Sequence, residues 1–135
     1  MRQFRVFICL LLLMSFGCTV FASERGTIIV YKGESENWSI ISNVNIVGNN
    51  VEYKYTVKYK GENIDSIGRV TYRLDSIAGS LGGASKLDAT SNNSRAGKII
   101  GRGGGGNIDL VSKATTIIAR VEWNNKLESF ELKKQ

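Results

Sequence analysis

TTIIARVEWNNKLESFEL, residues 115–132, is the stretch whose geometry can be read most firmly, and it predicts a β-hairpin. Asn124 and Asn125 separate two β-rich runs, and asparagine tolerates the left-handed backbone that a two-residue turn requires. A turn at these residues places Trp123 opposite Lys126 and sorts the side chains by polarity, because alternate residues of a strand face opposite sides. The sequence therefore predicts a sheet with one side on a core and the other in water. The face expected to be buried holds Trp123, Val121, Ala119, Ile117, Phe130 and Leu132.

Four more strands are predicted upstream, at residues 26–32, 38–46, 51–59 and 69–74, because β-forming residues there alternate with polar ones. The middle two form a second hairpin. A two-residue turn at Asn49 and Asn50 opposes Ile46 to Tyr53, whereas a four-residue loop shifts the pairs by two and keeps the same faces together. Either register preserves the core.

The strand pattern dissolves in the Gly-, Ser- and Asn-rich residues 75–107, where only 98–101 is expected to form a strand. Residues 108–111 are expected to add a short sixth piece. Some seven strands in one small domain predict an all-β fold, specifically an antiparallel β-sandwich of immunoglobulin-like form, with a small β-barrel as the alternative. A single domain is expected over residues 23–135.

The first 22 residues are predicted to be a signal peptide. Arg2 and Arg5 precede an apolar run that is too short to span a bilayer, and the small-residue exit places cleavage before Ser23. A competing cleavage site resembles a bacterial lipobox, in which Cys18 is the candidate for lipidation. The favoured expectation is secretion, with a lipid anchor to the cell membrane as the alternative.

The chain has no histidine, and both its cysteines, Cys9 and Cys18, lie in the expected leader. Ser-His and Cys-His catalysis, histidine-based zinc sites and a disulfide in the mature domain are therefore excluded. The 18 basic residues outnumber the 12 acidic ones, which is compatible with an anionic partner but is also what solubility alone requires.

Carboxylates are spread singly along the chain, apart from Glu34 and Glu36 in a polar turn. Solvation explains that pair better than a calcium or catalytic role does. Glu128 is turned by the hairpin register toward the apolar face, and it is expected at the rim of the sheet beside Lys126. No catalytic, metal-binding or cofactor-binding residue is predicted.

GRGGGGN, residues 101–107, formally matches the G-x-G-x-x-G spacing of phosphate-binding loops. That fingerprint needs a helix after it, and residues 108–111 do not read as a helix start. A β-connection is the favoured interpretation. The alternative is an anion-contacting loop with Arg95, Lys98 and Arg102 as the candidate contacts. No aromatic residue accompanies this charge, which argues against nucleic acid.

The aromatic residues Trp38, Tyr53, Tyr55 and Tyr59 could line a cleft for sugars or peptide, but such a stripe is more often part of a core. Trp38 and Trp123 are expected to meet across two sheets, each beside a hairpin turned by an Asn-Asn pair.

Three segments carry a resemblance: YKGESENW (31–38), YKG (59–61) and VEWNNK (121–126). They resemble small exported proteins and lipoproteins of bacilli and related Gram-positive bacteria, most of them of unknown function. The resemblance implies a compact extracytoplasmic β-domain without an active site.

The sequence thus predicts a monomeric, non-enzymatic, extracytoplasmic module that binds a protein or an anionic cell-envelope component. The alternatives are a carboxylate-dependent cell-wall-active enzyme and a structural or immunity-type surface protein.

Overall fold

The computed structural model describes residues 25–87 and 97–135, which form an almost entirely β structure. A short 3-10 helix, Ile64–Ser66, and one α-helix, α2 (Ile108–Lys113), interrupt the strands. The strands are β1 (Thr27–Glu34), β2 (Trp38–Val47), β3 (Asn50–Tyr59), β4 (Gly68–Ser76), β5 (Gly79–Leu87), β6 (Lys98–Gly104), β7 (Thr116–Trp123) and β8 (Lys126–Lys134).

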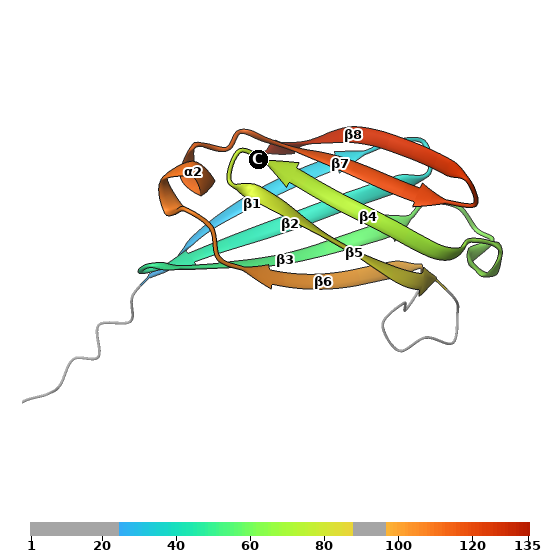
Figure 1. Ribbon diagram of the computed structural model, residues 1–135, viewed down its shortest axis with the longest axis horizontal. Helices are drawn as coiled ribbons and strands as arrows, with labels where there is room; N and C mark the ends of the chain where they lie inside the picture. The colour runs from blue at the N-terminus through green and yellow to red at the C-terminus, as the bar shows by residue number, and fades with distance from the viewer. Residues whose placement is uncertain (1–24, 88–96) are drawn as a thin grey trace, which may run out of the picture.

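The eight strands form one antiparallel sheet in the order β5-β4-β7-β8-β1-β2-β3-β6. The sheet curls so that β4, β7 and β8 lie in front of β1, β2 and β3, and its edge strands β5 and β6 come near each other without pairing (Figure 1). The all-β, antiparallel prediction is confirmed. A nearly closed single sheet with two facing layers agrees with both predicted forms, the sandwich and the small barrel.

The terminal hairpin has the predicted register, with Trp123 opposite Lys126 and Ile117 opposite Leu132. Its turn residues Asn124 and Asn125 have φ angles of 46° and 58°, both in the left-handed region that a type I′ turn requires. The predicted inner face is buried except for Phe130, which is half-buried.

The β2–β3 hairpin differs from the expected turn by one residue. Val47 pairs with Asn50, so Gly48 and Asn49 form the turn, and only Gly48 takes a positive φ, of 56°. Ile46 consequently faces Val51 and not Tyr53. The shift of two leaves the inward and outward faces unchanged, as the sequence pattern requires. The expectation that both hairpins turn on Asn-Asn pairs is wrong, because glycine takes the left-handed position here at no steric cost.

The region expected to be irregular contains two full strands, β5 and β6. β5 pairs with β4 along its whole length, and β6 pairs with β3. Their regularity is hidden in the sequence because glycines take the place of the side chains that would alternate. Tyrosines from the neighbouring strands fill that space: Tyr55 covers Gly101, and a Cβ added at Gly83 would lie 2.8 Å from the Tyr72 hydroxyl.

The short strand expected at residues 108–111 is instead the start of helix α2. The Asn107 side chain caps it by accepting hydrogen bonds from the backbone N–H groups of Asp109 at 2.9 Å and Leu110 at 3.3 Å. Val111 is its buried residue. Within the described segments, no helix has the length and apolar character needed to cross a membrane.

One hydrophobic cluster fills the space between the layers. Trp38 is 0 % exposed and Tyr55 is 4 % exposed, so the prediction of an aromatic core holds for these two residues. Tyr53 and Tyr59 pack against the cluster but are only partly buried. The opposite, outward positions of the same strands carry the charged side chains described next.

A candidate anion-binding face on β3 and β6

Outward positions of β3 and β6 place four exposed cations together. Strand alternation sends Lys54 and Lys58 of β3 to the outside, because Val51, Tyr55 and Val57 point inward. In β6 the exposed positions include Lys98 and Arg102. We call Lys54, Lys58, Lys98 and Arg102 the basic face.

The register of β3 and β6 sets these cations directly opposite one another. Lys54 pairs with Arg102, and Lys58 pairs with Lys98. Like charges at directly opposed positions of an antiparallel ladder repel and destabilise the sheet. Within the described residues, no carboxylate forms an ion pair with any of the four. The arrangement concentrates positive charge without neutralising it.

Apolar side chains lie between the two cationic pairs. Ile100 pairs with Thr56, which pairs in turn with Ile41 of β2 and brings that residue into the same row. Ile41 is 42 % exposed and Ile100 is 54 % exposed. Lys32 of β1 continues the row beyond Ile41. The face therefore combines an apolar centre with cations on its borders.

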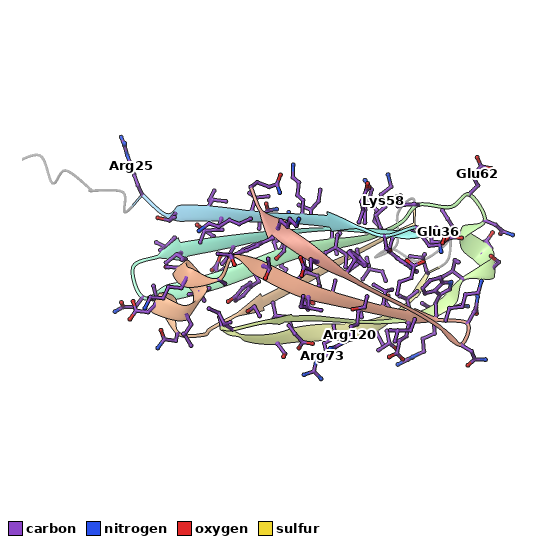
Figure 2. The ribbon with its side chains drawn as sticks, turned by 90° about the horizontal axis from the view of Figure 1, so that it is seen from above. Arg25, Glu36, Lys58, Glu62, Arg73 and Arg120 are labelled. Atoms are coloured by element: carbon purple, nitrogen blue, oxygen red, sulfur yellow. The ribbon has the colours of Figure 1, made fainter. Side chains whose placement is uncertain are left out.

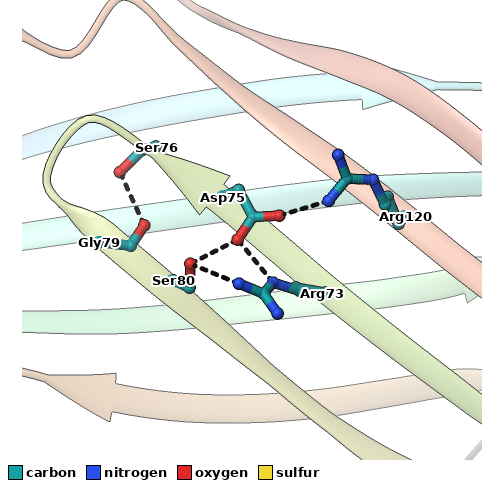
Figure 3. Close-up of polar contacts among 6 residues, drawn as sticks. All are labelled: Arg73, Asp75, Ser76, Gly79, Ser80 and Arg120. Carbon is teal, nitrogen blue, oxygen red and sulfur yellow. Dashed lines mark hydrogen bonds and ion pairs between the residues drawn. The ribbon is translucent and has the colours of Figure 1, made fainter.

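On the opposite side of the molecule, a similar pair of cations is bridged by a carboxylate. Arg73 and Arg120 are direct neighbours on β4 and β7, and they lie on the side away from Lys58 (Figure 2). Asp75 lies between them and accepts from Arg73 at 2.7 Å and from Arg120 at 2.9 Å, while Ser80 donates to the same carboxylate (Figure 3). Hydrogen bonds from Ser80 and Arg73, followed by the two guanidinium charges, lower the pKa of Asp75 despite some desolvation.

Two of the three predicted contact residues come together on this face. Lys98 and Arg102 lie on the same outward side of β6, whereas Arg95 and the lipidation candidate Cys18 lie outside the described residues. Sequence reasoning missed Lys54 and Lys58. The alternation of lysine with tyrosine and valine in β3 showed that they point outward, but nothing local showed that β6 is the partner of β3.

The glycine motif does not build a phosphate loop. Gly101 and Gly103 lie inside strand β6, where they pair with Tyr55 and Tyr53. The first N–H groups of α2 are already bound by Asn107. A strand does precede and a helix does follow the motif, so the expected context was wrong, but the Asn107 side chain already occupies two backbone donors at the start of that helix, the N–H groups of Asp109 and Leu110.

Glu128 has different partners from those expected. Ser35 and the Asn37 side chain both donate to its carboxylate, the latter at 2.6 Å, so Glu128 ties the β1–β2 turn to β8 and does not pair with Lys126. Desolvation opposes ionisation, but hydrogen bonds from Ser35 and Asn37 and the charge of Lys60 outweigh it and lower the pKa of Glu128. Glu34, of the Glu34–Glu36 pair, forms an ion pair with Lys60 at 3.5 Å. Across the described residues, no group of three His, Cys, Asp or Glu side chains could hold a metal ion.

Comparison with known proteins found no matching family model, no matching curated protein and no matching solved structure.

Proposed function

We propose that the chain is a non-enzymatic extracytoplasmic binding module and that its basic face binds an anionic polymer of the cell envelope. The observation that carries the proposal is the pairing of like charges at directly opposed positions of the ladder, Lys54 with Arg102 and Lys58 with Lys98. Such pairings cost stability, and an anionic ligand that lies along the two strands would relieve the repulsion. The proposal extends the anion contact predicted for Lys98 and Arg102 to Lys54 and Lys58 of β3.

The geometry suits an extended, repeating ligand. Lys54 and Lys58 are four residues apart on one strand, so their Cα atoms lie about 13 Å apart, while the facing strands are about 5 Å apart. Phosphate or carboxylate groups spaced along a polymer would meet a cationic pair at each end of this rectangle. Ile41 and Ile100 offer apolar contact to the backbone of the polymer between those ends.

A non-enzymatic role is supported by the state of Asp75 and Glu128, the two carboxylates of the described residues whose pKa values are shifted. Both Asp75 and Glu128 have lowered pKa values, and both accept several hydrogen bonds. A general acid in a glycosidase needs the opposite shift, to keep its proton near neutral pH. Their hydrogen bonds have a structural explanation, as bridges between strands and turns.

Cosedimentation with purified Gram-positive cell walls tests the proposal. Changing all four residues of the basic face to Ala should weaken pelleting at least about tenfold at low salt. A control variant that removes the same number of exposed cations elsewhere, with Arg69, Lys113, Lys126 and Lys134 changed to Ala, should retain most of the binding. Walls stripped of anionic polymers should pellet neither protein. Equal losses in the two variants would reduce the effect to net charge and contradict the proposal.

Salt dependence provides a second measurement on the same variants. Exposed charges are screened within about 8–10 Å at ordinary ionic strength, so binding by the native protein should fall steeply as salt rises. The basic-face variant should show a much shallower dependence. Arg95 lies outside the described residues, and the single variant Arg95→Ala tests whether it contributes to cell-wall binding.

We further propose that residues 1–22 direct export and are removed, leaving residues 23–135 as the mature domain. The alternative is lipid attachment at Cys18. Labelling cells with a radioactive fatty acid decides between them: a label that disappears in Cys18→Ser would establish the anchor, and an unlabelled protein released to the medium would establish secretion.

A further inference from the structure

A cavity of about 130 Å³ lies between the two layers of the sheet, near the β4–β5 turn. Ser42, Leu74 and Ile117 reach it from β2, β4 and β7, and it is bordered by Gly104, the last residue of β6, and by Gly105 and Gly106, which follow that strand. Tyr53 also lines it, whereas the next residue, Lys54, faces outward into the basic face. The cavity is therefore separate from the proposed polymer site.

Ser42 is the unexplained residue of this cavity. It is 0 % exposed, and its Oγ has no hydrogen-bond partner among the described residues. Its inward neighbours along β2, Ile40 and Val44, are apolar and equally buried. A buried hydroxyl that gives up water without gaining a partner destabilises the fold, and an apolar side chain would avoid that cost. A ligand that bonds to Ser42 would account for the hydroxyl.

The other two serines at the cavity are already engaged. Ser76 Oγ donates to the Gly79 carbonyl at 3.3 Å (Figure 3). It also accepts from the Ala78 backbone N–H at 3.2 Å. Ser80 bonds to the carboxylate of Asp75 on the outer surface. Ser42 thus remains available, together with the Tyr53 hydroxyl. The pKa of a tyrosine phenol is ordinarily 10.0 and burial raises that of Tyr53 further, so this hydroxyl is protonated at neutral pH with or without the shift and can donate.

The remaining lining determines the chemistry of the ligand. Leu74, Ile117, Ala78 and Leu81 give the cavity apolar walls, and among the described residues no charged side chain lines it. An ion would therefore lose its hydration without gaining a counter-charge. The volume is close to that of apolar cavities that admit one benzene-sized molecule, roughly 150 Å³. Gly105 and Gly106 leave the border of the cavity free of side-chain bulk.

We infer that this cavity binds a small, neutral, amphipathic molecule, about the size of phenol or cyclohexanol, whose hydroxyl or carbonyl bonds to Ser42 and whose ring or alkyl body packs on Leu74 and Ile117. Small closed or nearly closed β-sheets commonly hold one such ligand in the interior. The Tyr53 hydroxyl provides the second polar contact.

Chemical-shift titration of the full mature domain tests this inference with defined probes: cyclohexanol, phenol, benzene and benzoate. Cyclohexanol and phenol should bind with dissociation constants below about 1 mM, with shifts centred on the cavity residues. Benzene should bind more weakly, and benzoate should not bind there. Absence of cavity shifts with every probe at 10 mM would overturn the inference and leave a site filled by water only.

Two substitutions at one position separate binding from folding. Ser42→Ala removes the hydroxyl, and it should weaken cyclohexanol at least about tenfold, leave benzene nearly unchanged and keep or raise the unfolding midpoint. Ser42→Val replaces the hydroxyl by two methyl groups that narrow the cavity beside β2, and it should weaken every probe. Ser129→Ala, at an exposed position of β8, is the matched control. Unchanged cyclohexanol affinity in Ser42→Ala would contradict the inference, even if Ser42→Val failed to fold.

Discussion

Trp38 and Trp123 meet edge-to-face between the two layers, with ring centroids 5.3 Å apart and an interplanar angle of 70°. Trp38 begins β2 and Trp123 ends β7, so the contact joins two hairpins that are far apart in the sequence. The Tyr59 ring also packs against Trp38, with the ring centroids 5.3 Å apart. The Trp38 indole N–H has no hydrogen-bond partner among the described residues, so packing alone holds the ring.

Trp123→Ala should destabilise the domain by about 3–5 kcal/mol, because it removes a large ring that is only 5 % exposed. Urea unfolding followed by circular dichroism measures the loss. Combined with Trp38→Ala in a double-mutant cycle, the pair should show a coupling of about 0.5–1.5 kcal/mol. Strictly additive losses would contradict a direct edge-to-face contact.

The β7–β8 turn should be sensitive to backbone conformation. Asn125 has a φ of 58°, which β-branched residues strongly disfavour. Asn125→Val should therefore cost about 1–2 kcal/mol, whereas Asn125→Gly should be neutral or slightly stabilising. Asn124 is a poorer site for this comparison because its side chain also donates to the Ser66 carbonyl at 3.0 Å. Equal unfolding midpoints for the Val and Gly variants would contradict the turn geometry.

The terminal hairpin could be predicted because its information is local. Two strands, their turn and their faces lie within 18 residues, and both the Asn-Asn turn and the alternation point to one register. The β2–β3 faces were equally clear, but a glycine next to two asparagines left the turn ambiguous by one residue. The pairing of Val47 with Asn50 and the positive φ of Gly48 resolve it.

The candidate site could be predicted only in part because it depends on a pairing that is not local. Lys98 and Arg102 were recognised from their charge, but Lys54 and Lys58 become their neighbours only when β6 pairs with β3, which joins residues 40 and 48 positions apart in the sequence. The glycines of β6 concealed that strand. Their packing partners, such as Tyr55 over Gly101, come from another strand, so no alternation appears in β6 itself.

Gly101→Ala tests this account of the glycines. The added methyl group would collide with the Tyr55 ring, so the change should cost about 1–3 kcal/mol. The ring is the obstacle, so Tyr55→Leu should make the alanine much better tolerated. Gly104→Ala is the control, because its added Cβ would lie 3.2 Å from the Val51 carbonyl oxygen and meet no ring. Equal costs at the two glycines would contradict the packing role.

The basic face should be a site where stability and binding conflict. Lys58→Glu places opposite charges across the ladder at Lys98, so it should raise stability by about 0.2–1 kcal/mol at low salt. Pelleting with cell walls should fall in the same variant. The stability gain should disappear in high salt, where exposed charges are screened. A loss of stability at low salt would show that repulsion between these lysines is not significant.

Glu128 should make the stability of the domain depend on pH in the acid range. Its carboxylate accepts from Ser35 and Asn37, and its pKa in the folded state lies below the ordinary value of 4.5. A lowered folded-state pKa means that the ionised group stabilises the fold fully above the unfolded-state value and loses that contribution as pH falls through the folded-state value. Glu128→Gln should therefore cost about 1–2 kcal/mol at pH 7. The difference in unfolding free energy between Glu128→Gln and the native protein should shrink below about pH 4.5. It should vanish once Glu128 is protonated in both the folded and the unfolded native protein.

Urea unfolding of both proteins between pH 7 and pH 3 measures this convergence. Glu131→Gln, at an exposed position of the same strand, controls for the general effect of removing one negative charge. Because Glu128 ties β8 to the β1–β2 turn, hydrogen exchange at Ser35 and Asn37 should quicken in Glu128→Gln at neutral pH but not in Glu131→Gln. A stability difference that stayed constant down to pH 3 would mean that the negative charge of Glu128 does not stabilise the turn. The hydrogen bonds to the ionised carboxylate would then not explain the stability that is lost in Glu128→Gln.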